Sequence, residues 1–174
     1  TVAAMETDNK WVNHYCAQRG KLAAGKLVYA EPGRTETTLF IRAGRADMGE
    51  VSAPPEGCAY AIAGVPVLRQ GKAVSWTAAK DQGWEASSLY ATWHIFAGYG
   101  QDRSKITVVA LRTTTGNLIS SGEGAKKLAA LGLREAIKLD GGGSTILRAG
   151  GKTPVCTAGN RRICTVLTFG GDPY

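Results

Sequence analysis

Short apolar segments separated by turn-forming residues run along most of this chain, and this pattern limits the fold to one rich in β-strands. Segments such as 25–31 and 94–100 are brief and rich in apolar residues, which is typical of strands. Polar, glycine and proline residues between them, as in EPGRT at 31–35, indicate turns. Residues 1–11 resemble a helix end or a loop. We predict strands over residues 11–16, 25–31, 37–51, 58–74 (with a break at 64–66 and a hairpin at 69–72), 94–100, 105–112, 135–140, 144–150 and 162–170.

One segment, 123–131, has the periodicity of an amphipathic helix instead. Ala125, Leu128 and Leu131 lie on one face, whereas Lys126 and Lys127 lie on the other. The serines at 120–121 resemble an N-cap region, and Gly132 resembles a C-terminal stop. Many strands with one clear helix predict an α+β fold of mixed or antiparallel sheets. The strand 144–150 is expected to pair with the strand 135–140.

The length and composition favour a single domain over residues 1–174. A chain of 174 residues with 44% hydrophobic residues buries about two thirds of its unfolded surface, which is enough for one core. No apolar run approaches the roughly 20 residues that a membrane-spanning helix needs, so we expect no membrane association.

The chain is basic, with 21 lysine and arginine residues against 14 aspartate and glutamate residues and a formal charge of +7. This balance favours anionic partners such as phosphates. The basic residues are scattered, however, and the densest clusters are only the pairs at 126–127 and 161–162. Without a contiguous basic tract, we expect no nucleic-acid partner.

The cysteine spacing bears on metal binding and on location. Cys16, Cys58, Cys156 and Cys164 lack the C-x-x-C pairs that zinc sites prefer, and we expect neither a metal nor another cofactor. Cys156 and Cys164 flank a short loop that a disulfide would close. Such a disulfide predicts an extracellular, cell-envelope or lumenal protein. Buried free thiols in a cytoplasmic or phage-borne protein remain the alternative.

An aspartate and three glycines at the end of a predicted strand form the most distinctive motif. Asp140 precedes the glycines at 141–143, and Ser144 and Thr145 follow them. Successive glycine N–H groups in a turn can form a concave site for a phosphate oxygen. The alternative is a tight turn in which Asp140 only caps the backbone. The motif is not a Walker phosphate loop, because no G-K-[ST] follows and the next segment is strand-like.

The glycine turn and segments elsewhere in the chain resemble the phosphodiester glycosidase family. Residues 136–147, AIKLDGGGSTIL, resemble its glycine-turn signature. Asn13 and Tyr15 fall on an early family motif, Gly64 falls on a hairpin motif, and Arg161 falls on an arginine of the last strand.

These motifs occur in the family's order, and the resemblance covers about residues 10–170. The chain also departs from the family at three positions. His94 stands where the family usually has arginine, Thr165 where it usually has asparagine, and Val65 replaces a glycine.

The resemblance implies a hydrolase that releases a sugar similar to N-acetylglucosamine from a sugar-1-phosphate diester. It places Asp140 at the anomeric carbon, as nucleophile, base or electrostatic stabiliser. It places His94 at the phosphate, as a contact or in proton transfer. The residues expected to bind the substrate are Asn13, Tyr15, Gly64, Gly141, Gly142, Gly143, Ser144, Thr145 and Arg161.

Two other classes of function remain open at this point. The departures at His94 and Thr165 favour a non-catalytic domain that holds a phosphorylated glycan or a related phosphate ligand. A basic nucleic-acid binder is the weaker alternative, and its affinity should fall steeply with salt. Trp84 and Trp93 flank a polar loop, where one of them is a candidate to stack on a sugar ring.

Overall fold

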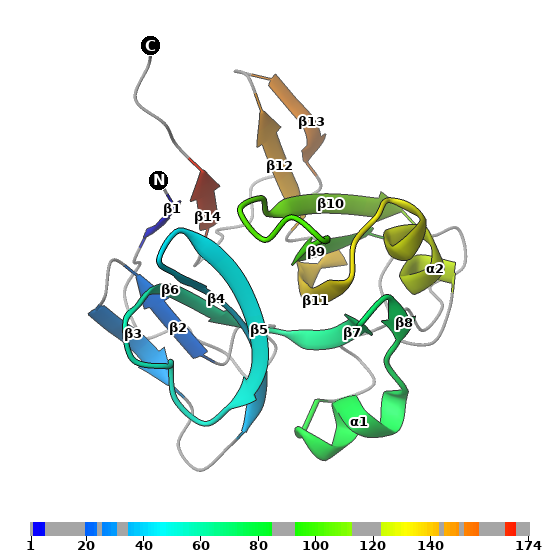
Figure 1. Cartoon of the computed structure of the whole chain (residues 1–174). Coiled ribbons are helices and arrows are strands. Elements are labelled where there is room, and N and C mark those ends of the chain that lie inside the picture. Colours follow the sequence, from blue (N-terminus) through cyan, green and yellow to red (C-terminus); the bar gives the residue numbers. More distant parts are fainter. Residues whose placement is uncertain are drawn as a thin grey trace.

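Two antiparallel sheets of five strands each are the largest assemblies in the described part of the molecule (Figure 1). The structure, a computed structural model, describes residues 2–5, 20–23, 26–30, 35–84, 93–112, 123–142, 145–149, 152–156 and 166–169. Strands in the first sheet follow the order β3-β2-β6-β4-β5, and strands in the second follow β10-β9-β11-β7-β8. Together with two short helices, this architecture confirms the predicted α+β class.

The first sheet contains β2 (Gly20–Ala23), β3 (Lys26–Ala30), β4 (Glu36–Arg42), β5 (Arg45–Val51) and β6 (Cys58–Ala63). The second contains β7 (Val65–Arg69), β8 (Lys72–Ala73), β9 (Trp93–Tyr99), β10 (Thr107–Arg112) and β11 (Glu135–Gly141). The helices of the described residues are α1 (Trp76–Asp81) and α2 (Glu123–Ala130). Two further ribbons pair β1 (Val2–Met5) with β14 (Val166–Phe169) and β12 (Ile146–Ala149) with β13 (Lys152–Cys156).

Several predicted segments have different boundaries or partners in the structure. The predicted strand 37–51 is a hairpin, because Ala43 and Gly44 have φ of 48° and 70° and reverse the chain. Positive φ at both central residues is what a tight type I′ turn requires. The predicted hairpin at 69–72 is confirmed, and its turn residues are Gln70 and Gly71, with φ of 51° and 77°.

Tertiary pairing explains two further differences. Residues 2–5, predicted as a helix end or loop, form β1, which pairs with β14 at the opposite end of the chain. The prediction that 144–150 pairs with 135–140 is wrong, since β12 pairs with β13 instead. Both edges of β11 are already occupied, by β7 and by β9.

The helices also differ in part from the prediction. Helix α1 was not predicted, and its N-cap residue Ser75 accepts a hydrogen bond from Ala78 N at 3.3 Å. Helix α2 matches the expected segment but ends before Leu131, which is 61% exposed instead of packed. Gly132, with φ of 86°, turns the chain there, as predicted.

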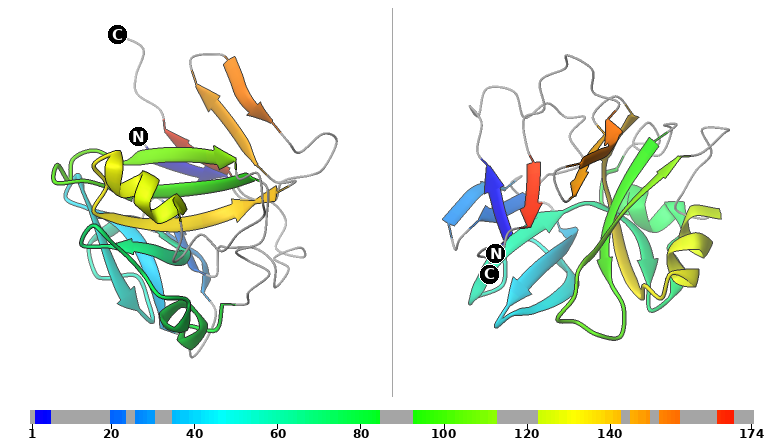
Figure 2. Two further views of the ribbon diagram at one scale, coloured as in Figure 1. Left: turned by 90° about the vertical axis from the view of Figure 1, so that its right-hand side faces the viewer. Right: turned by 90° about the horizontal axis from the view of Figure 1, so that it is seen from above.

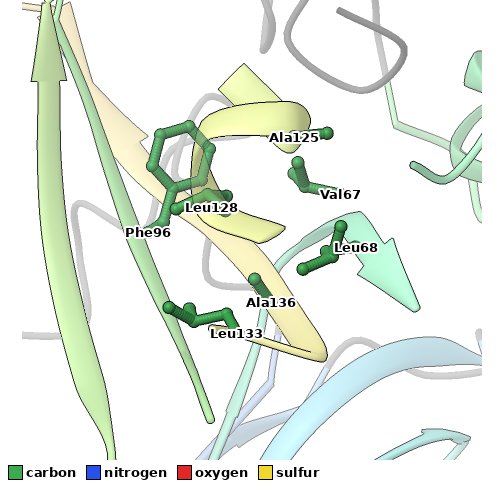
Figure 3. Packing of buried hydrophobic residues seen from close by; sticks show 7 residues of the cluster. All are labelled: Val67, Leu68, Phe96, Ala125, Leu128, Leu133 and Ala136. Atoms are coloured by element: carbon green, nitrogen blue, oxygen red, sulfur yellow. The ribbon is translucent and has the colours of Figure 1, made fainter. Parts of the chain in front are cut away.

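Two apolar layers pack the second sheet on both of its faces. Between the sheets, Leu39 and Ile62 meet Ile137 and Leu139. The opposite face is covered by α2 (Figures 1 and 2). Figure 3 shows this layer, which contains Val67, Leu68, Phe96, Ala125, Leu128, Leu133 and Ala136. Because both faces of β11 are covered, residues 136–139 are all buried.

Polar contacts connect the end of β9 and the turn between β9 and β10 to the first sheet. Arg103 Nη2 lies 2.6 Å from Asp47 Oδ2, and the Tyr99 hydroxyl lies 3.4 Å from the other oxygen of that carboxylate. Burial, followed by the charges of Glu135 and Asp47, raises the pKa of Tyr99 to about 12. Hydrogen bonds from Ser104 lower the pKa of Asp102 in the same turn to about 2.

Cys58 is a buried free thiol, and burial raises its pKa. Cys16 and Cys164 lie outside the described residues, as does the side chain of Cys156, so the expected disulfide stays a prediction. No helix in the described part of the chain is long and apolar enough to cross a membrane.

Candidate active site

Buried polar side chains gather at one end of the two sheets. Among the residues whose side chains are described, the buried polar and charged ones are Glu36, Thr37, Thr38, His94, Lys138 and Thr145. The strand pairing explains why they collect there. The start of β4 lies opposite the end of β6, the start of β7 lies opposite Lys138, and the end of β11 lies opposite His94. We call this region, residues 36–38, Gly64, His94, 138–142 and Thr145, the polar end.

The chain passes from one sheet to the other through Gly64, the only residue between β6 and β7. Its N–H donates to Thr37 O at 3.0 Å. A Cβ atom at this position would lie 2.7 Å from Lys138 O and 3.0 Å from Ile137 Cδ1, closer than a side chain tolerates. Close packing of the two sheets therefore accounts for this glycine, while its expected contact with substrate stays a prediction.

The backbone of Asp140 lies at the end of β11, next to an irregularity in the pairing with β9. Lys138 is opposite Phe96, and Gly141 is opposite His94. Three steps along β11 thus match two along β9, which places one extra residue in β11. Such a bulge bends the strand and redirects its side chains. The side chain of Asp140 lies outside the described residues.

The glycine turn is described at its two ends. A Cβ atom on Gly141 would lie 2.6 Å from Trp93 O, so only glycine lets β11 approach β9 this closely. Gly142 has φ of 58°, and its carbonyl accepts a hydrogen bond from Thr145 N at 3.3 Å. Gly143 and Ser144 lie outside the described residues, and the anion site predicted for this turn stays a prediction.

His94 lies near the beginning of β9 and is fully buried. Its ring packs beside Phe96, with ring centroids 6.1 Å apart and an angle of 26° between the planes. The register sets it opposite Gly141. The structure thus brings together His94, Gly141, Gly142, Thr145 and the backbone of Asp140, all of which the sequence analysis selected.

Lys138 is a residue of the polar end that was not predicted as a site residue, and residues 36–38 are others. Its side chain is only 3% exposed, and its Nζ donates to Leu139 O at 3.0 Å. This Nζ also lies 3.6 Å from the position that a Cβ atom on Gly141 would take. The sequence signal for this burial is a lysine among apolar residues of a predicted strand. The structure adds that both faces of this strand are covered.

Contacts between β4 and the C-terminal end of α1 border the polar end. The side-chain carbonyl of Gln82 accepts from Thr37 N at 2.8 Å, and its amide group donates to Thr37 Oγ1 at 2.9 Å. Trp84 is 3% exposed and packs with Val65 and Ala79. Trp84, a candidate to stack on a sugar ring, therefore lies in the core.

Three of the expected substrate-binding residues, Asn13, Tyr15 and Arg161, lie outside the described residues and stay predictions. Within the described part of the chain, no three histidine, cysteine, aspartate or glutamate residues are grouped so that they could hold a metal ion. The polar end contains the imidazole of His94, the amino group of Lys138 and the carboxyl group of Glu36, together with the strand end that carries Asp140.

Fold and site together define a two-sheet α+β domain with a polar end built around a strand that ends in a glycine turn. The chain belongs to the phosphodiester glycosidase family, whose family model matches residues 3–169. No curated protein matches it in sequence.

Two solved structures match this chain, and the first of them is similar to it in fold. One is the zebrafish N-acetylglucosamine-1-phosphodiester alpha-N-acetylglucosaminidase catalytic domain auto-inhibited by pro-peptide, at 20% sequence identity and a TM-score of 0.64. The match covers 85% of this chain and 56% of that one, so the chain spans just over half the length of that structure. The other is a hypothetical protein from Synechocystis, at 12% identity and a TM-score of 0.47, with 95% of this chain and 42% of that one covered.

Proposed function

We propose that this domain hydrolyses the bond between a sugar, similar to N-acetylglucosamine, and the phosphate of a sugar-1-phosphate diester. The observation that carries the proposal is the match to the phosphodiester glycosidase family along nearly the whole chain. The position of Asp140, at the end of β11 and within the polar end, supports it. The net charge of +7 favours an anionic substrate of this kind.

Hydrolysis breaks the bond between the anomeric carbon and the bridging phosphate oxygen. The electron pair of that bond stays on the oxygen, which leaves as part of a phosphate monoester, and the oxygen of water becomes the new anomeric hydroxyl. Because the leaving group is already a stabilised anion, it needs less protonation than an ordinary sugar alcohol. The site therefore needs negative charge at the sugar and positive charge or N–H donors at the phosphate.

The proposed roles follow from this distribution of charge. Asp140 acts at the anomeric carbon, where positive charge develops, as nucleophile, base or electrostatic stabiliser. His94 and Arg161 serve the phosphate, together with backbone N–H groups of 141–144. Asn13 orients the sugar or the phosphate through hydrogen bonds.

The decisive experiment uses an alkyl diester of N-acetylglucosamine 1-phosphate in water labelled with oxygen-18. We expect release of free sugar together with the alkyl phosphate, and the label should appear in the sugar hydroxyl. Label in the phosphate would mean that the phosphorus–oxygen bond breaks, and this would refute the proposed reaction. An N-acetylglucosaminide without phosphate is the matched control and should be cleaved far more slowly.

A non-catalytic domain that binds phosphorylated glycans is the second candidate. The histidine at position 94, where the resemblance predicts arginine, favours this candidate. The same substrate separates the two functions. Saturable binding without release of sugar, under conditions that keep the protein folded, would support a binding domain and exclude the hydrolase.

An exported location forms part of the proposal, and the cysteines provide its test. If Cys156 and Cys164 are paired, the closed loop stabilises the end of the chain by about 2 to 3 kcal/mol. A thiol titration on unfolded protein from its native compartment should then find two reactive thiols among the four cysteines. Four reactive thiols would contradict both the pairing and the argument for export.

A further inference from the structure

Lys138 is one of two ionisable side chains with acid or amine groups that are buried among the described residues; the other is Glu36. Lysine is almost never fully buried unless its charge is held by polar or charged groups, because removing an ammonium from water is costly. Here the side chain is 3% exposed, and Nζ donates to the neighbouring carbonyl of Leu139 at 3.0 Å. The fold thus places an amino group inside the second sheet, where an apolar side chain would be less costly to bury.

The pairing of β11 with β9 determines where this charge lies. Lys138 is opposite Phe96, and His94 packs beside the ring of Phe96, two residues earlier on β9. After the bulge, Gly141 is opposite His94, and the missing side chain of Gly141 leaves Lys138 Nζ 3.6 Å from its Cβ position. The ammonium group therefore lies at the last residues of β11, beside the start of the glycine turn.

We propose that Lys138 is the cation that binds the phosphate of the substrate. The inference rests on the proposed function and gives a role to a residue that lies in the glycine-turn motif but has no role in that proposal. An ammonium group is a compact point charge with three N–H donors, which suits a phosphate oxygen. In a site that excludes water, such a charge also acts more strongly on the negative charge that collects on the leaving phosphate.

The test measures binding of methyl phosphate, a phosphate monoester that resembles the leaving group. Lys138→Met keeps the length of the side chain and removes its charge, and we expect at least about 10-fold weaker binding, since hydrogen bonds to charged groups are strong. Lys126→Met is the matched control, because Lys126 is exposed on α2. Its affinity should equal that of the unaltered protein.

A second variant distinguishes binding from a merely structural role. In the Lys138→Met protein, we add His94→Arg, which places a guanidinium on the neighbouring strand opposite Gly141. Methyl phosphate affinity should recover at least in part, because a permanent cation returns to the same place. Support of the strand end by Lys138 would not be restored in this way, and the absence of any recovery would count against phosphate binding.

The outcomes separate this inference from the proposed function. Release of sugar by the unaltered protein, with unchanged methyl phosphate affinity in Lys138→Met, would overturn the role of Lys138 and leave the hydrolase intact. If methyl phosphate binding depends on Lys138 but no sugar is released, the role of Lys138 stands and the proposed hydrolase is wrong. If kcat falls while the affinity stays, Lys138 acts on another catalytic group and the inference is wrong.

Measurements on the unaltered protein protect the test against misfolding of Lys138→Met. Methyl phosphate should shift the backbone amide resonances of 138–141 and His94, and shifts confined to other segments would overturn the inference. Lys138→Arg, which keeps the positive charge, should retain most of the affinity if it folds. No detectable binding of methyl phosphate by the unaltered protein would also overturn it.

Discussion

Lys138 and His94 are candidate site residues because they are buried, and residue type alone does not indicate this. Each stands in a strand of the second sheet, and each is buried, at 3% and 0% exposure. The sequence analysis selected His94 through a resemblance but treated Lys138 as an ordinary strand residue. Only the two apolar layers that cover β11 and β9 show that a charged side chain lies inside.

Asp140 carries the strongest prediction at the residue scale. Asp140→Asn keeps the size of the side chain and removes the charge that would stabilise a positive anomeric carbon. Turnover of the phosphodiester should fall at least about 100-fold, equivalent to ~2.7 kcal/mol of barrier, with little change in melting temperature. Asp81→Asn, an exposed substitution of the same type, should leave turnover unchanged. Full activity in Asp140→Asn would mean that Asp140 only caps the turn and has no catalytic role.

Tyr99 predicts how stability depends on alkaline pH. Its folded-state pKa is raised to about 12 from 10.0, mainly by burial, so the folded protein keeps a proton that the unfolded chain loses. The associated stability is complete below about pH 10 and disappears as the pH rises toward about 12. Urea denaturation across this range should show a smaller loss for Tyr99→Phe than for the unaltered protein. Equal losses in the two proteins would contradict this.

At the scale of elements, the direct passage from β6 to β7 decides how the two sheets meet. One residue, Gly64, separates a strand of the first sheet from a strand of the second. The sequence analysis predicted the break at 64–66 but not the change of sheet. Turn signals are local, whereas the choice of a partner strand depends on which edges the rest of the chain has already occupied.

Gly64→Ala tests this crossing. The new methyl group would lie 2.7 Å from Lys138 O, and the sheets must move apart to accept it. We expect a loss of about 1 to 3 kcal/mol in the free energy of unfolding, measured by urea denaturation. Gly49→Ala, in β5, is the control, because its nearest contacts would be at 3.9 Å and its stability should change little. Similar effects in both variants would refute the packing argument.

At the scale of the whole molecule, the two sheets share one apolar layer. Leu39 and Ile62 of the first sheet pack with Ile137 and Leu139 of the second. Neither sheet can lose its partner without exposing this layer to water. We therefore expect one domain that unfolds in a single transition, with far-ultraviolet circular dichroism and tryptophan fluorescence giving the same midpoint.

Ile137→Ala tests the shared layer. Ile137 is fully buried between the sheets, so the cavity should cost about 2 to 5 kcal/mol and shift both probes together. Ile146→Ala serves as control, since Ile146 is 39% exposed and its loss should cost much less. Separate midpoints for the two probes would show that the sheets unfold independently.

The sequence by itself determined the class of fold, the strands predicted at 94–100 and 105–112, the helix predicted at 123–131 and the position of the glycine turn. These features depend on contacts between near neighbours, such as turn residues and helical periodicity, which the local sequence encodes. Three features depend on the tertiary structure alone. Strand β1 pairs with β14, β12 pairs with β13 and not with β11, and Lys138 is buried. The physical reason is that strand pairing and burial depend on surfaces supplied by distant segments, and no local pattern records which surface a strand will meet.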